Sequence, residues 1–140
     1  MTINNEIYKL KELATKFRTA IMKCKLKTPL ISMQNFPYGA CGDATLLLAK
    51  YFNDNKCGGF YYVLGYWGNK SHAWLQKGDI IIDITADQFN SQNTSVIFMK
   101  GHKWRTKHKI ESKEIADFTK HDSYTVSLLS NTYKIITEHL

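Results

Sequence analysis

The stretch SHAWLQKGDIIIDIT, residues 71–85, decides the fold, because it has the composition of two β-strands joined by a tight turn. Aromatic and β-branched residues fill both halves, and a short Lys-Gly-Asp segment separates them. If Gly78 and Asp79 are the two central residues of the turn, Leu75 lies opposite Ile82. We therefore expect an antiparallel pair of strands whose register follows from the turn.

This register decides whether two polar side chains meet. It places His72 and Asp83 on one face as diagonal neighbours, about 7–8 Å apart at their Cα atoms and within side-chain reach. The same face carries Trp74, Ile81 and Thr85. A three-residue loop without a bulge would instead place His72 and Asp83 on opposite faces of the sheet.

Two further runs have the composition of strands. They are FYYVLGYW, residues 60–67, and TSVIFM, residues 94–99, and glycine, asparagine and lysine separate them from the central hairpin. Short connections make neighbouring strands antiparallel. The sequence therefore predicts an antiparallel sheet built from four runs.

The N-terminal part of the chain has helical periodicity. Apolar residues recur there every three or four positions with lysines between them: Ile3, Ile7, Leu10, Ala14, Phe17, Ile21 and Cys24. This pattern predicts an amphipathic helix packed on a core. Pro29 closes the region, and residues 30–40 read as a loop.

A second helix is predicted to start near Cys41, within FPYGACGDATLLLAKYF, residues 36–52, and to stop near residues 53–55. Its predicted buried stripe is Ala44, Leu47, Leu48 and Tyr51. The segment SYTVSLL alternates like a strand, and residues 131–140 fit either a helix or an edge strand, so this part stays open. We predict an α+β domain in which N-terminal helices pack on an antiparallel sheet.

The length, composition and net charge of the chain limit the class of protein. With 140 residues, 44% of them hydrophobic, the chain is expected to form one domain, residues 1–140, with its own core. The three cysteines fit no paired pattern, which favours free thiols in a reducing cytoplasm. No apolar run reaches the roughly 20 residues that span a bilayer. The net charge of +7 favours association with acidic partners but does not indicate which reaction or ligand is involved.

Cys41 is the candidate nucleophile. A thiolate at the start of a helix is favoured by the unpaired backbone N–H groups and the helix dipole. Gly39 and Gly42 add little bulk, so a carbonyl substrate could approach, and the Cys41 N–H could face an oxyanion. A cysteine at a helix start, taken alone, is more often a small buried residue.

The presence of His72 and Asp83 favours a catalytic role of Cys41 over a structural one. An imidazole that accepts the thiol proton, and a carboxylate that fixes the imidazole tautomer, complete a nucleophile, base and orienting group with Cys41. A metal site made of these three residues and Cys57 has suitable ligands but lacks the close paired spacing of zinc sites. We expect no metal and no cofactor.

These residues resemble those of transglutaminase-like, papain-fold cysteine enzymes, and most closely the compact peptidases that remove leader segments from lasso-peptide precursors. The resemblance covers residues 35–98 and rests on Cys41 in GACGDATLLLAKYF, His72 in SHAWLQ and Asp83 in DIIIDI. It implies that Cys41 is the nucleophile, His72 the base and later the acid, and Asp83 the orienting carboxylate. It also implies a papain-like core.

The same resemblance implies an oxyanion hole with a side-chain amide about six positions before the nucleophile. Asn35 holds that position and Gln34 precedes it, and we favour Gln34 because its side chain is longer. Large transglutaminases have Gln and Trp on either side of the nucleophile, whereas this chain has Ala40 and Gly42, which argues against protein crosslinking.

The expected substrate is a peptide or protein, which a partner protein could present to the site. Trp74 and Trp67 are candidates to line the cleft, although aromatic residues are more often core residues. The choice between hydrolysis and acyl transfer stays open, because it depends on whether water or an amine reaches the acyl-enzyme.

The alternative hypothesis is that the protein is a nucleic-acid-binding module. The stretch MKGHKWRTKHKIESK, residues 99–113, surrounds Trp104 with cations that could contact phosphates while the ring stacks on a base. A basic run is usually a solvated surface, and an isolated basic loop defines no binding fold. We expect only weak binding without sequence preference from such a loop.

Overall fold

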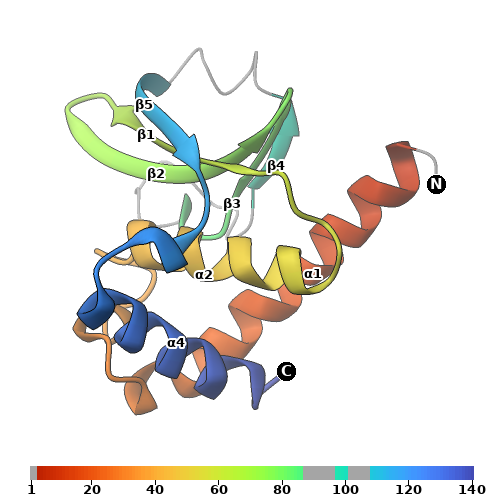
Figure 1. The fold of residues 1–140 in the computed structure, drawn as a ribbon. Helices are drawn as coiled ribbons and strands as arrows, with labels where there is room; N and C mark the ends of the chain where they lie inside the picture. Colours follow the sequence, from red (N-terminus) through yellow and green to blue (C-terminus); the bar gives the residue numbers. More distant parts are fainter. Residues whose placement is uncertain (1–2, 87–96, 101–107) are drawn as a thin grey trace.

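The computed structural model describes residues 3–86, 97–100 and 108–140. This part of the chain has an α+β fold, as the sequence predicts (Figure 1). Its longer helices are α1 (Ile3–Cys24), α2 (Cys41–Asp54) and α4 (Ser123–Thr137). Its strands are β1 (Tyr61–Trp67), β2 (Lys70–Lys77), β3 (Ile80–Asp83), β4 (Ile97–Lys100) and β5 (His108–Ile115). Short 3₁₀ turns occupy Lys25–Lys27, Ile31–Met33 and Phe118–Lys120.

The strands of the described chain form one antiparallel sheet in the order β4-β3-β2-β1-β5. Leu75 lies opposite Ile82, and Lys77 lies opposite Ile80, so Gly78 and Asp79 form the two-residue turn between β2 and β3. Gly78 has a φ of +58°, which this kind of turn favours in glycine. The predicted hairpin register is confirmed.

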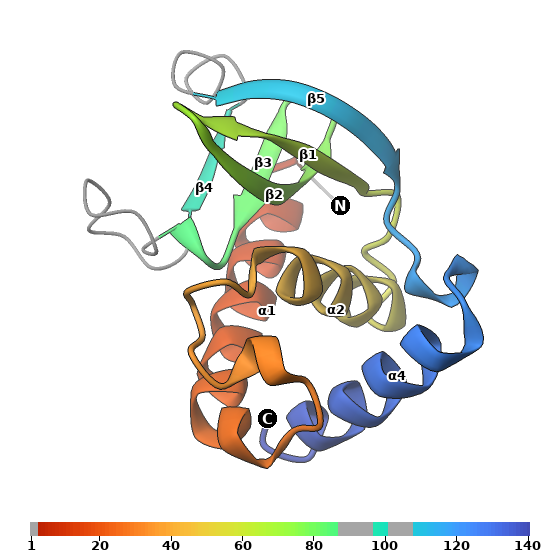
Figure 2. The same cartoon turned by 90° about the vertical axis from the view of Figure 1, so that its left-hand side faces the viewer.

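The helices lie on one side of this sheet. Figure 2 shows α2 running beneath the strands, with α4 on the far side of α2 and α1 along the flank of both. The rings of Phe17 and Tyr51 stack with centroids 5.0 Å apart, and Tyr133 lies 6.2 Å from Phe17. These three rings join α1, α2 and α4 into the main core.

The two predicted N-terminal helices are confirmed. On α1 the predicted stripe is buried from Leu10 to Cys24. On α2 the burial is wider than the predicted stripe, because Thr45, Leu46, Ala49 and Phe52 are buried as well. A helix that is buried almost all round lies between other elements, which is the place of α2 between the sheet and α4.

The prediction of a basic loop over residues 99–113 is wrong for the described part of that stretch. Residues 108–115 form β5, which pairs with β1 and adds a fifth strand to the four predicted runs. Every side chain from Lys109 to Ile115 is exposed, so the strand has no alternation between apolar and polar residues. Hydrophobic periodicity, the main sequence signal for a strand, is therefore missing here. Residues 101–107, including Trp104, lie outside the described residues.

The C-terminal segment that the sequence left open is helix α4. The Asp122 side chain accepts hydrogen bonds from the Thr125 N–H at 2.9 Å and from its hydroxyl at 2.8 Å, which caps the first turn. Leu129, Tyr133 and Ile136 face the core at helical spacing. The alternation in SYTVSLL is thus overridden by a cap and a longer helical pattern.

Candidate active site

Cys41 is the first residue of α2, and its side chain is half-buried. Ala40 occupies the N-cap position and supplies no side-chain hydrogen bond, so the first N–H groups of the helix are not capped by it. The Ser32 hydroxyl donates to Asp43 Oδ2 at 2.5 Å, which fastens the preceding loop to the first turn of α2. The thiol therefore stands at a well-anchored helix start.

His72 and Asp83 form a buried hydrogen-bonded pair. His72 Nε2 lies 2.5 Å from Asp83 Oδ2, and both side chains are almost inaccessible to solvent. The pair lies on β2 and at the end of β3, as the predicted register requires. The structure therefore brings these two predicted site residues together.

The second carboxylate oxygen of Asp83 is also occupied. Asp83 Oδ1 accepts the Thr85 N–H at 2.9 Å and the Thr85 hydroxyl at 3.2 Å. An aspartate that bonds the backbone two residues ahead forms a local turn of its own. These bonds fix the plane of the carboxylate and aim its other oxygen at His72.

The first turn of α2 is attached to β2 through the backbone of Ala73. The Thr45 hydroxyl donates to the Ala73 carbonyl oxygen at 3.4 Å, and the Ala73 backbone also bonds the Cys41 sulfur. Cys41 and Thr45 are four positions apart and so lie on the same face of α2. The backbone of Ala73 therefore links β2 to the helix that carries Cys41.

The Cys41 thiol has a lowered pKa. Burial alone would raise the pKa, but a hydrogen bond with His72, the positive charge of His72 and the bond from Ala73 together outweigh burial and the Asp83 charge. Since Nε2 of His72 faces Asp83, the ring nitrogen left for the sulfur is Nδ1. His72 is thus hydrogen-bonded both to the Cys41 thiol and to the Asp83 carboxylate.

The pKa of His72 is raised to about 9. Burial would lower this pKa, but the charge and hydrogen bond of Asp83 raise it, and the hydrogen bond and charge of Cys41 add to the effect. A raised imidazole pKa and a lowered thiol pKa favour a thiolate paired with an imidazolium at neutral pH. Such a pair is an activated sulfur nucleophile.

Helix α1 holds both sides of this site in place. The Arg18 guanidinium donates a short hydrogen bond to the carbonyl oxygen of Ile84, next to Asp83. The same guanidinium lies 5.0 Å from the centroid of the Phe36 ring, in the loop that leads to Cys41. One side chain therefore links the end of β3 to the entry of α2.

Trp74 does not line an open cleft, so that prediction is wrong. The Trp74 side chain is fully buried in a small cluster with Val63, Ile81 and Ala86. Its ring lies 6.1 Å from the His72 ring, and its Nε1–H donates to Gln76 at 3.4 Å. The ring therefore lies close to the imidazole inside the protein and does not reach solvent.

Space for the Trp74 ring is made by Gly65, which pairs with His72 across β1 and β2. A Cβ at Gly65 would lie 2.6 Å from the Trp74 ring and 2.2 Å from the Lys109 carbonyl oxygen. The register between β1 and β5 also shifts between Leu64 and Gly65. Only glycine fits at this crowded position.

The other residue predicted to line the cleft is Trp67. Its side chain lies outside the described residues, so its role stays a prediction.

Gln34 and Asn35 lie in the loop before α2, and both side chains are exposed. Gln34 ends the 3₁₀ turn Ile31–Met33. Within the described residues, neither side-chain amide forms a hydrogen bond that would aim it at Cys41. Their role in an oxyanion hole stays a prediction.

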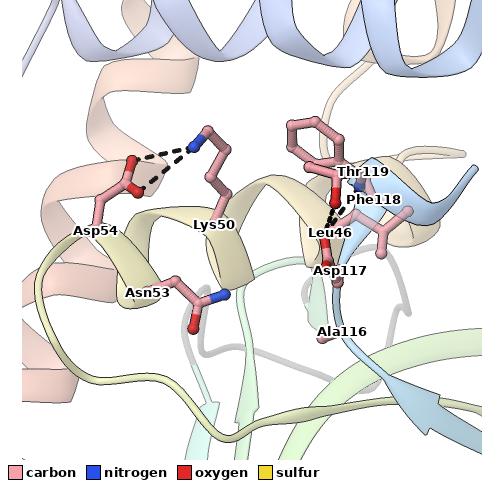
Figure 3. Close-up of a pocket in the computed structure, with 8 residues that line it drawn as sticks. All are labelled: Leu46, Lys50, Asn53, Asp54, Ala116, Asp117, Phe118 and Thr119. Carbon is pink, nitrogen blue, oxygen red and sulfur yellow. Dashed lines mark hydrogen bonds and ion pairs between the residues drawn. The ribbon is translucent and has the colours of Figure 1, made fainter. Parts of the chain in front are cut away.

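A pocket elsewhere in the protein is not part of this site. A cavity of about 190 Å³ lies between the second half of α2 and residues 116–119, and Figure 3 shows the side chains that line it. Four of its polar groups pair with one another: Lys50 with Asp54 at 3.4 Å, and Asp117 with the Thr119 hydroxyl at 2.6 Å. None of the three predicted catalytic residues lines this cavity.

Three residues around the site have a place that the sequence does not predict: Thr45 and Tyr62, which it does not connect with the site, and Thr85, which it places on the face of His72 and Asp83 without a role. Thr85 had a signal, because Asp-x-Thr is a common local hydrogen-bonding motif. Thr45 is one helical turn after Cys41, but its bond to Ala73 depends on the position of β2. The sequence predicts only that Tyr62 lies in a strand. Its hydroxyl lies beside Gly42 of α2 because the sheet packs on that helix.

No family of known proteins, no curated protein and no solved structure matches this chain. In the described part of the chain, no group of three potential ligands is arranged to hold a metal ion. The helices described here include none that is long and apolar enough to cross a membrane. The site therefore has to be interpreted from its own geometry.

We expect iodoacetamide to label Cys41 faster than Cys24 or Cys57 near neutral pH. Cys24 and Cys57 are buried, with exposed fractions of 1% and 7%, and burial raises the pKa of Cys24. Cys41 is more accessible and its pKa is lowered. A brief pulse followed by mass mapping of the native protein measures the three rates. Equal labelling of all three thiols, or protection of Cys41 alone, would contradict this prediction.

Proposed function

We propose that the protein is a cysteine-dependent hydrolase or acyltransferase that acts on a peptide or amide bond through an acyl-enzyme, with peptide hydrolysis as the favoured reaction. The observation that carries the proposal is the 2.5 Å bond between His72 and Asp83, with the imidazole in turn bonded to Cys41. These residues match the roles of nucleophile, base and orienting group.

A purely structural role explains this arrangement less well. A buried charged pair is weak support for stability, because desolvation offsets much of the attraction between the charges. Here the hydrogen bonds continue beyond the buried pair, because His72 is also bonded to the half-exposed Cys41 thiol at a helix start. The bond network also lowers the pKa of that thiol, which packing alone does not require.

The reaction follows from the positions of the three groups. His72 Nδ1 takes the Cys41 proton, and the thiolate attacks the carbonyl carbon, moving the π electrons to the carbonyl oxygen. The tetrahedral intermediate collapses when the imidazolium gives its proton to the leaving amine, which leaves a thioester on Cys41. Water, activated by His72, then releases the acid and restores the thiol; an amine in place of water would give transfer.

The resemblance to transglutaminase-like, papain-fold enzymes, and to lasso-peptide leader peptidases in particular, is part of the proposal. Its support is the order of the three residues and their elements: a helix-start cysteine, then a histidine and an aspartate on neighbouring strands. A cytoplasmic peptide or protein substrate, presented by a partner protein, fits this proposal. The nucleic-acid alternative depends largely on residues 101–107, which lie outside the described residues.

Acylation of Cys41 tests the proposed function. Incubation with a p-nitrophenyl ester should release a burst of one nitrophenol per protein and add one acyl group to the Cys41 peptide. Cys41→Ser should lose the burst, whereas Cys24→Ser, at a buried thiol of the core, should retain it. Acylation spread over surface lysines, or a burst that survives in Cys41→Ser, would contradict the proposal. With a primary amine present, formation of the amide in place of the free acid then distinguishes acyl transfer from hydrolysis.

A further inference from the structure

Tyr62 brings a hydroxyl group to the first turn of α2. The residue lies on β1, opposite Leu75 of β2, and its half-buried side chain packs against the main core. A Cβ built on Gly42 would be 3.2 Å from Tyr62 Oη. The hydroxyl therefore sits over the residue that directly follows Cys41.

Gly42 keeps the space that this hydroxyl occupies. A contact of 3.2 Å is tighter than ordinary van der Waals packing, so a Cβ at position 42 would shift the phenol oxygen by a few tenths of an ångström. From the sequence, Gly42 is expected only to leave room for a substrate. Its contact with Tyr62 gives a second reason for a glycine after the nucleophile.

The Tyr62 hydroxyl is a neutral donor. Burial, with smaller contributions from the negative charges of Cys41, Asp43 and Glu114, raises the pKa of Tyr62 to about 12. The charge of Cys41 can act on it because the two groups are close. Among the described residues, the hydroxyl makes no hydrogen bond with the protein. A half-buried donor beside a nucleophile is thus left for another acceptor.

We propose that Tyr62 is a catalytic residue whose hydroxyl donates a hydrogen bond to the oxyanion formed when Cys41 attacks a carbonyl group. This inference rests on the proposed function. When the carbon–sulfur bond forms, the π electrons of the carbonyl move to its oxygen, and a donor held near the sulfur stabilises that charge. The phenol keeps its proton throughout, and the backbone N–H groups at the start of α2 face the same region.

This assignment gives Tyr62 the role that the sequence suggested for Gln34 or Asn35. Those two amides are exposed on a loop, whereas Tyr62 is fixed by a strand within the sheet. A donor must be held in place before the charge develops, because its reorganisation would otherwise cost free energy in the transition state. A residue on a strand meets this condition better than one on a loop.

Tyr62→Phe removes the hydroxyl and retains the ring. We expect it to slow acylation by the p-nitrophenyl ester about 100-fold, the usual effect of removing one oxyanion donor. A peptide aldehyde, which forms a tetrahedral adduct with the thiol, should bind more weakly by a similar factor. Iodoacetamide builds no oxyanion at a carbonyl, so its reaction with Cys41 should be unchanged. Tyr61→Phe, at the adjacent strand position, is the matched control.

The three measurements separate the outcomes. Equal acylation by Tyr62→Phe and the unmodified protein would overturn the role of Tyr62 and leave the proposed function standing. A parallel loss of acylation and alkylation would also overturn it, since that pattern means a disturbed site. If the unmodified protein is neither acylated nor bound by the aldehyde, the proposed function fails and this inference fails with it.

A second variant covers the case in which Tyr62→Phe does not fold. Gly42→Ala keeps the phenol but places a methyl group 3.2 Å from its oxygen, which shifts the hydroxyl. It should slow acylation and leave alkylation unchanged, as Tyr62→Phe does. Unchanged acylation in a folded Gly42→Ala protein would count against the role of Tyr62.

Discussion

Asp83→Asn should fold normally and lose turnover by about 10⁴-fold, because the amide forces His72 into the wrong tautomer. The Thr85 N–H and hydroxyl both donate to one oxygen of residue 83. Only the carbonyl oxygen of an asparagine can accept these bonds, so its NH₂ group must face His72 Nε2. That nitrogen then becomes an acceptor, the proton moves to Nδ1, and Nδ1 can no longer take the proton of Cys41.

Asp87→Asn is the control for this prediction. Asp87 is the other carboxylate of the IIDITADQF stretch and lies outside the described residues. From the sequence we expect it to cap a turn, so its replacement should change stability by about 1 kcal/mol and leave acylation nearly intact. Ester acylation rates and circular dichroism measure both effects. If Asp87→Asn abolished acylation and Asp83→Asn did not, the orienting role would belong to Asp87.

The central hairpin could be predicted from the sequence because its register depends on local information. Gly78 and Asp79 favour a two-residue turn, and a two-residue turn leaves one register for the strands it joins. The pairing of Leu75 with Ile82 and the contact of His72 with Asp83 both follow from it. The position of Cys41 at a helix start was equally local, since Gly39 precedes the apolar period of α2.

Other parts of the fold depend on contacts that the sequence does not encode locally. Strand β5 is stabilised by its bonds to β1 and buries almost none of its side chains, so its sequence looks like a charged loop. The burial of Trp74 depends on the absence of a side chain at Gly65 on the neighbouring strand. Tyr62 meets α2 only because the sheet packs on that helix. Each case needs a partner that is distant in the sequence.

His72→Gln should reduce turnover by several orders of magnitude, because it removes the group that accepts and returns the proton, a contribution of about 10²–10⁴-fold. Glutamine is the suitable replacement because its amide can still donate to Asp83, so the buried carboxylate keeps a partner. Replacement by alanine would leave that charge unpaired and risk unfolding the protein. Thermal unfolding followed by circular dichroism checks that the variant is folded.

The pH dependence of Cys41 alkylation distinguishes loss of the base from general damage. In the unmodified protein the pKa of Cys41 is lowered from the ordinary 9.0, so alkylation should persist as the pH falls below 9. In His72→Gln the hydrogen bond and positive charge of the imidazole are gone, while burial and the Asp83 charge remain, and both raise the pKa of Cys41.

The alkylation profile of His72→Gln should therefore move to higher pH, with slow reaction at neutral pH and recovery in alkaline solution, where the thiol ionises without help. Lys50→Gln, which removes an exposed charge at the far end of α2, is the control and should keep the original profile. An unchanged profile in His72→Gln would mean that the imidazole does not activate Cys41. A rate that stays low at every pH would instead mean that access to the thiol has been lost.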